Sequence, residues 1–136
     1  MQSTNTNFLT HHYCNRKHLM ISEVIAFPQK KEEVLDEDLN TQEFILRHDP
    51  STWIVDISAE GLIFPVDIMG RMKAWLPMLK FTKLKKIAFI TGGHIVARDF
   101  VISILLEFGN YESRPAISFK PFEYKVKAEE WLMAKH

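Results

Sequence analysis

Residues 52–58 read TWIVDIS, and this run is apolar enough to predict a strand in the centre of a sheet. A second run of the same kind, KIAFIT, occupies residues 86–91. Strands that are apolar on both sides are typical of the interior of parallel sheets. We therefore predict that these two segments are adjacent or near-adjacent parallel strands in the interior of one sheet.

Helical segments alternate with strands on both sides of this centre. The pattern predicts strands at 8–14, 19–27 and 116–119, and helices at 30–48, 65–79, 95–108 and 126–135. The order is ββαβαβαβα, which is typical of the α/β class. We expect a mixed, mostly parallel sheet of about five strands with an antiparallel edge hairpin and about four helices.

The helix at 30–48 has an apolar face and an acidic first half. The predicted core face consists of Leu35, Leu39, Gln42 and Leu46, with Val34 and Ile45 at its flanks. The acidic residues are Glu32, Glu33, Asp36, Glu37 and Asp38. Negative charge suits a helix N-terminus, and we interpret this cluster as a solvated helix face.

Length and composition fit one globular domain. The chain has 136 residues, of which 46% are hydrophobic and 25% charged. The polar start predicts a disordered tail at residues 1–7, followed by a single domain at 8–136. Cys14 is the single cysteine, so we expect a reduced thiol and no internal disulfide.

The charge balance bears on partners and location. Lys plus Arg equals Asp plus Glu at 17 each, and a nucleic-acid binder would usually carry a basic excess. Zero net charge weakens repulsion between copies, which favours self-association. We find no signal peptide and no apolar run of membrane-spanning length. We therefore expect a cytoplasmic protein with no nucleic-acid partner and no membrane span.

The chain contains an ordered series of short motifs: WIVDIS at 53–58, WLP at 75–77, KIAFI at 86–90, ISF at 117–119 and AEEWL at 128–132. This series resembles the STAS family, in particular its SpoIIAA-like and CRAL-TRIO-like branch. The resemblance implies a STAS-like fold and a regulatory or binding role, and its lipid-binding relatives imply an apolar ligand. The family's phosphorylated serine would fall at residues 64–66, where the chain has Phe-Pro-Val. The phosphorylation switch therefore does not carry over.

A second resemblance is to response-regulator receivers. Asp56, Thr91 and the Lys-Pro at 120–121 look similar to the receiver residues that end strands three, four and five. The acidic pair that receivers carry after strand one is missing here. Phosphoryl transfer to aspartate needs Mg²⁺, which needs that carboxylate cluster. A degenerate receiver is therefore kept only as an alternative.

The turn Gly92-Gly93-His94 follows the strand at 86–91 and opens the next helix. Ligands of open parallel sheets bind beyond the carboxyl ends of the strands. The ligand-binding candidates at that edge are Ser58, Thr91, Gly92, Gly93, His94 and Lys120. Two glycines alone predict a tight turn more strongly than a phosphate loop, which would need more glycine and a Lys before Ser or Thr.

We find no constellation for catalysis, metal binding or a cofactor. His11 and His12 are adjacent in a strand and point to opposite faces, so they cannot bind one metal together. The remaining histidines show no ligand spacing with each other or with Cys14. No nucleophile elbow is present. The sequence predicts neither an enzyme nor a cofactor.

The helix at 95–108 is apolar nearly all round. One face contains Ala97, Val101, Ile104, Leu105 and Phe108, and Phe100, Ile102 and Leu106 extend apolar surface beyond it. Such a helix is buried on more than one side. We predict a homodimer that uses Phe100, Ile102 and Leu106. Covering by loops of the same chain, or by a ligand, stays open as the alternative.

The sequence thus predicts a non-catalytic, STAS-like binding or regulatory module that acts by protein–protein contact with self-association. The first alternative is a carrier or sensor of a small apolar, lipid-like ligand. The second is the degenerate receiver.

Overall fold

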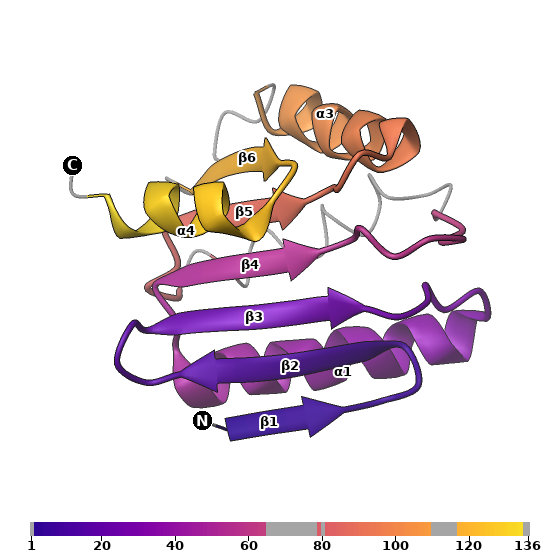
Figure 1. Cartoon of the computed structure of the whole chain (residues 1–136). Coiled ribbons are helices and arrows are strands. Elements are labelled where there is room, and N and C mark those ends of the chain that lie inside the picture. The colour runs from indigo at the N-terminus through magenta and orange to yellow at the C-terminus, as the bar shows by residue number, and fades with distance from the viewer. Residues whose placement is uncertain (1, 65–78, 80, 110–116, 135–136) are drawn as a thin grey trace.

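The computed structural model describes residues 2–64, 79, 81–109 and 117–134 (Figure 1). Most of the helix expected at 65–79, with its WLP motif, lies outside the described residues. The described elements are β1 (Gln2–Asn5), β2 (Leu9–Cys14), β3 (Leu19–Val24), α1 (Lys31–His48), β4 (Thr52–Asp56), β5 (Lys86–Ile90), α3 (Ile95–Gly109), β6 (Ser118–Phe122) and α4 (Lys125–Met133).

The described strands form one mixed sheet in the order β1-β2-β3-β4-β5-β6. β1, β2 and β3 are antiparallel neighbours, whereas β3, β4, β5 and β6 run parallel. β4 and β5 are adjacent in the interior, with Trp53 opposite Ile87. The α/β class, the parallel centre and the antiparallel edge are therefore confirmed. The described part has six strands and three helices, where about five and about four were expected.

The extra strand is β1, which lies in the segment that we expected to be a disordered tail. The side chain of Thr6 accepts hydrogen bonds from the backbone N–H groups of Phe8 and Leu9, both at 3.1 Å, and so closes the turn into β2. Ser3 and His12 are joined side chain to side chain at 2.7 Å. A polar segment can be ordered here because an edge strand gains backbone partners without burying its side chains.

The helices cover the two faces of the sheet differently. α1 and α3 contribute to one buried cluster, whereas α4 contributes to the other. Figure 1 shows α4 on the near side of the sheet and α1 on the far side, behind β2. The side covered by α1 and α3 also contains a cavity between these helices and the sheet. We call this side the cavity face, and the opposite side the α4 face.

α1 lies on the sheet in an orientation that contradicts the predicted core face. Leu35, Leu39 and Leu46 are 54%, 64% and 61% exposed. The buried residues are Glu37, Thr41, Phe44 and Ile45. The helix has this orientation because His11 and Ser22 are buried on the sheet beneath it. Buried polar groups require hydrogen-bond partners, and His11 contacts Thr41 and Phe44 of α1.

The ends of the helices follow local rules. α1 ends where the sequence predicts, because Asp49 adopts a left-handed conformation with φ 47° ahead of Pro50. α4 is held at its C-terminal end by Lys86 of β5. The ammonium group of Lys86 donates to the carbonyl oxygens of Trp131 at 2.8 Å and Ala134 at 3.2 Å. A cation there also complements the negative end of the helix dipole.

Candidate functional site

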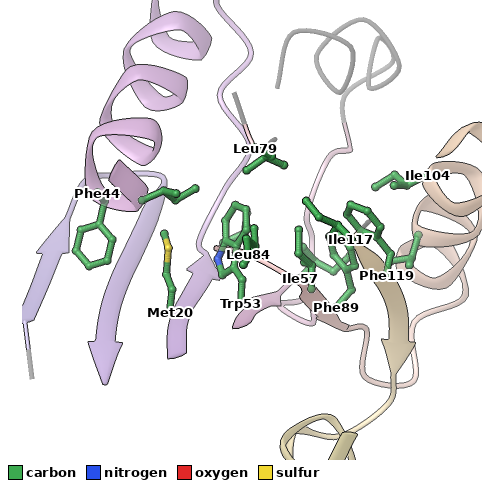
Figure 2. Close-up of a cluster of buried hydrophobic side chains, with 14 of the residues drawn as sticks. Met20, Phe44, Trp53, Ile57, Leu79, Leu84, Phe89, Ile104, Ile117 and Phe119 are labelled. Atoms are coloured by element: carbon green, nitrogen blue, oxygen red, sulfur yellow. The ribbon is translucent and has the colours of Figure 1, made fainter. Parts of the chain in front are cut away.

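A cavity of about 140 Å³ lies on the cavity face, between the sheet, α1 and α3. Its apolar walls come from the strands and from α3, and include Val24, Trp53, Val55, Ile87, Phe89, Phe100, Ile104 and Phe119. Figure 2 shows Trp53, Phe89, Phe119 and Ile104 between the sheet and the helices, with Leu79 above them. A dry apolar cavity of about 150 Å³ binds benzene in another protein, so this volume suits a single ring or a short chain.

Among the described residues, those that line the cavity with polar side chains come from α1, and they are Glu37, Asp38 and Thr41. Glu37 is only 5% exposed, and its Oε2 atom is buried without a hydrogen-bond partner. A buried acceptor left unpaired costs about 1–3 kcal/mol of stability. Glu37 therefore stands out among the cavity-lining residues as a group whose partner is missing from the described chain.

A chain of side-chain hydrogen bonds lies beneath α1, next to the cavity. The indole Nε1–H of Trp53 donates to Ser22 Oγ at 2.8 Å. Ser22 Oγ lies 2.7 Å from His11 Nδ1, and His11 Nε2 lies 3.1 Å from Thr41 Oγ1. Thr41 Oγ1 donates to the backbone carbonyl of Glu37 at 2.8 Å. We call these five residues the polar chain.

The donors of the polar chain can be assigned in one direction. The hydroxyl group of Thr41 donates its proton to the backbone carbonyl of Glu37, so its oxygen accepts a hydrogen bond from His11 Nε2–H. His11 Nδ1 is then an acceptor, and the hydroxyl of Ser22 donates to it. Burial, reinforced by the neighbouring His12, lowers the pKa of His11 to about 4. His11 is therefore neutral at neutral pH, as this assignment requires.

The Ser22–His11 pair resembles the start of a nucleophile–base arrangement, but its surroundings do not fit that use. Both residues are fully buried, and neither is among the residues that line the cavity. Ser22 Oγ already accepts from Trp53. The pair instead connects β2, β3 and β4 to α1 and fixes the turn of the helix that carries Glu37.

The strand-end candidates are partly brought together. Thr91, Gly92, Gly93 and His94 line an open hollow of about 380 Å³. Gly92 has φ +59°, and a Cβ added to it would lie 3.2 Å from Cβ of Ser58, so this position favours glycine. The hollow is also lined by Ile95, Arg98, Pro121, Phe122 and Glu123.

Ser58 and Lys120 do not line the hollow, although Ser58 lies against Gly92. Ser58 donates from both its hydroxyl and its backbone N–H to Asp56 Oδ1, at 2.6 and 2.9 Å. Lys120 is exposed, does not line the hollow, and its Nζ lies 5.5 Å from the ring centroid of Phe122. The sequence analysis missed Arg98 and Glu123, although Arg98 lies one helical turn after His94. Because these two have opposite charges, the hollow is not a simple anion site.

The predicted interface residues also separate. Phe100 is partly buried and packs against Phe27 and Phe64, with ring centroids 5.9 and 4.8 Å away. It therefore belongs to the interior and lines the cavity. Ile102 and Leu106 are 39% and 69% exposed. The side chain of Phe108 lies outside the described residues.

Two further findings concern the described residues. They contain no group of three or more His, Cys, Asp or Glu side chains placed to hold a metal ion. Among them, no helix combines the length and the apolar composition needed to cross a bilayer.

Comparison of the chain with protein-family models, with curated proteins and with solved structures finds no match. The resemblance to the STAS family, drawn from motifs in the sequence, stays a prediction.

Proposed function

We propose that this chain is a non-catalytic binding module that holds a small apolar molecule in the cavity between α1, α3 and the sheet. The observation that carries the proposal is the cavity itself, because its walls are almost wholly aliphatic and aromatic and it has the volume of one ring. This is the role of carrier or sensor that the resemblance to the STAS family implies. A cytoplasmic location belongs to the same proposal.

Toluene is a suitable first probe, since it is apolar and close to the cavity in size. We expect saturable binding that changes the fluorescence of Trp53, a residue of the cavity wall. Binding only to the folded state raises the free energy of unfolding, by about 2.7 kcal/mol when the free ligand is 100 times Kd. Thermal or urea unfolding with and without toluene measures this effect.

Val55→Phe fills the cavity from β4 and should abolish toluene binding. Val126→Phe adds the same volume on the exposed face of α4, where Val126 is 66% exposed, and should leave binding unchanged. If toluene neither stabilises the wild-type protein nor changes its fluorescence, the cavity is not a ligand site.

We also propose self-association, because a specific surface favours it. α3 exposes Ile95 together with Ile102 and Leu106, which are spaced to lie along one side of the helix. The formal net charge of zero opposes association of two copies only weakly, and a two-fold contact is the commonest way to bury such a shared surface.

Light scattering at increasing protein concentration tests this second proposal. We expect a dimer that Ile102→Glu combined with Leu106→Glu converts to a folded monomer. Leu39→Glu combined with Leu46→Glu places the same charges on α1 and serves as the matched control. A monomeric wild-type protein, or a dimer unaffected by the α3 changes, would contradict the proposal.

A further inference from the structure

Glu37 gives the cavity a chemical preference as well as a size. The walls contributed by the strands and by α3 are apolar, and the polar lining is confined to one turn of α1. Within that turn, Glu37 is 5% exposed and its Oε2 atom has no hydrogen-bond partner. An unpaired carboxylate oxygen beside an apolar cavity is complementary to a ligand that brings its own donor.

The position of Glu37 is fixed by contacts that are independent of its own carboxylate. Thr41 Oγ1 donates to the backbone carbonyl of Glu37 at 2.8 Å, and His11 in turn holds Thr41 at 3.1 Å. The polar chain therefore holds this turn of α1 against the sheet. Because the carboxylate is already desolvated and positioned, a donor on a ligand meets a prepared acceptor.

We propose that the molecule bound in this cavity is a small apolar amine, whose ammonium group is accepted by the carboxylate of Glu37 while its ring or chain fills the apolar space. An ammonium is the donor that best matches a buried carboxylate, since the hydrogen bond is charge-assisted and both charges are paired. This inference rests on the proposed function, because it requires the cavity to bind a ligand.

Three probes of nearly equal shape separate the contributions: toluene, benzyl alcohol and benzylamine. Calorimetric titration at neutral pH, where benzylamine is protonated, gives a Kd for each. We expect benzylamine to bind at least tenfold more tightly than toluene, with benzyl alcohol between them.

Glu37→Gln keeps the shape of the side chain and removes its charge. It should weaken benzylamine at least tenfold and change toluene by less than about threefold, and toluene binding itself demonstrates that the variant is folded. Asp36→Asn removes a neighbouring carboxylate that is exposed on α1 and is not part of the cavity lining, and it should leave all three affinities within about threefold.

The outcomes distinguish the two proposals. If none of the three probes binds the wild-type protein, the proposed function fails, and the present inference fails with it. If toluene binds but benzylamine binds no more tightly, or if Glu37→Gln binds benzylamine as well as the wild type, the cavity remains a ligand site and the amine preference is overturned. A benzyl alcohol affinity above that of benzylamine would assign a neutral donor instead, and would also overturn it.

Discussion

The two faces of the sheet differ in the side chains that are buried on them and in the presence of a cavity. On the α4 face, Leu19, Ile54, Ala88 and Ile90 of the strands pack against Ala128 and Leu132 of α4, and the buried Thr52 lies on the same side of β4 as Ile54. On the cavity face, the buried residues include His11, Ser22, Glu37 and Thr41 among the apolar side chains. The apolar packing of α4 against the sheet stabilises the fold, and it requires no ligand. The cavity face has in addition a polar chain and a cavity, and this combination of apolar walls with a few polar groups is the lining on which the proposed binding function rests.

The largest effect is expected from truncation on the α4 face. Ile54 is 1% exposed in the centre of that cluster, so Ile54→Ala should lower the free energy of unfolding by about 2–5 kcal/mol. Urea denaturation measures the loss. Ile21→Ala truncates a partly buried neighbour of the same cluster and should cost less. A cost below about 1 kcal/mol at Ile54 would mean that this face is not a packed core.

The second effect is a dependence of stability on pH that originates on the cavity face. The pKa of His11 is lowered from 6.5 to about 4 by burial and by His12. As the pH falls below 6.5, the unfolded state takes up a proton at His11 before the folded state does, so stability decreases until about pH 4. The loss is about 3 kcal/mol, since one pKa unit corresponds to about 1.4 kcal/mol.

Unfolding free energies at several pH values, compared between wild type and His11→Gln, isolate this contribution. The variant should show a flatter dependence between pH 6.5 and 4. The pKa of His48 is also lowered, by burial and then by Arg47, so His48→Gln is the matched control and should flatten the curve less. Identical curves for wild type and His11→Gln would contradict the burial of a neutral His11.

The third effect comes from breaking the polar chain at its middle. Ser22→Ala leaves both Trp53 Nε1–H and His11 Nδ1 without their partner, and should cost about 1–3 kcal/mol. Ser103→Ala removes an exposed hydroxyl on α3 and should stay within about 0.5 kcal/mol. Equal effects of the two changes on the urea midpoint would show that the chain contributes nothing.

The smallest effect is expected where the sequence pattern alone predicts a large one. Leu39 is 64% exposed on α1, so Leu39→Lys should change the free energy of unfolding by less than about 0.5 kcal/mol. Ile45→Lys places the same side chain on the buried face of the same helix and should prevent folding. If Leu39→Lys lowered the free energy of unfolding by more than about 2 kcal/mol, the leucine stripe of α1 would have to be buried, which would contradict the described orientation.

The centre of the sheet could be predicted because β4 and β5 are apolar on both sides, and such strands have one natural place in an α/β fold. The orientation of α1 could not. The helix carries two stripes of the same spacing, one with Leu35, Leu39, Gln42 and Leu46, and one with Glu37, Thr41, Phe44 and His48. Periodicity selects the leucines as core. The other stripe is buried instead, because β2 and β3 place His11 opposite Ser22 beneath α1. This pairing joins separate strands, so the sequence of the helix alone does not indicate it.

The candidate site residues could likewise be predicted where they are adjacent in the sequence, and not where they come from separate elements. Thr91, Gly92, Gly93 and His94 are consecutive, so topology alone places them together at a strand end. Lys120 does not line the hollow that they form, because it pairs with Ala88 in the middle of β6 and lies before the end of the strand. The polar chain was missed because no sequence motif joins its residues, and Glu37 was assigned to a solvated helix face although it is buried. A histidine on the same face of β2 as Leu9 and Tyr13 is a signal that a buried polar partner is needed.

Lys120 has a second consequence, together with its neighbour Pro121, because β6 is the outermost parallel strand of the described sheet. A lysine and a proline on an outer strand hinder the addition of a strand from another molecule. The opposite edge is β1, which is four residues long and polar, and short polar edges act in the same way. Both edges of the described sheet thus carry features that hinder strand-to-strand growth into fibrils.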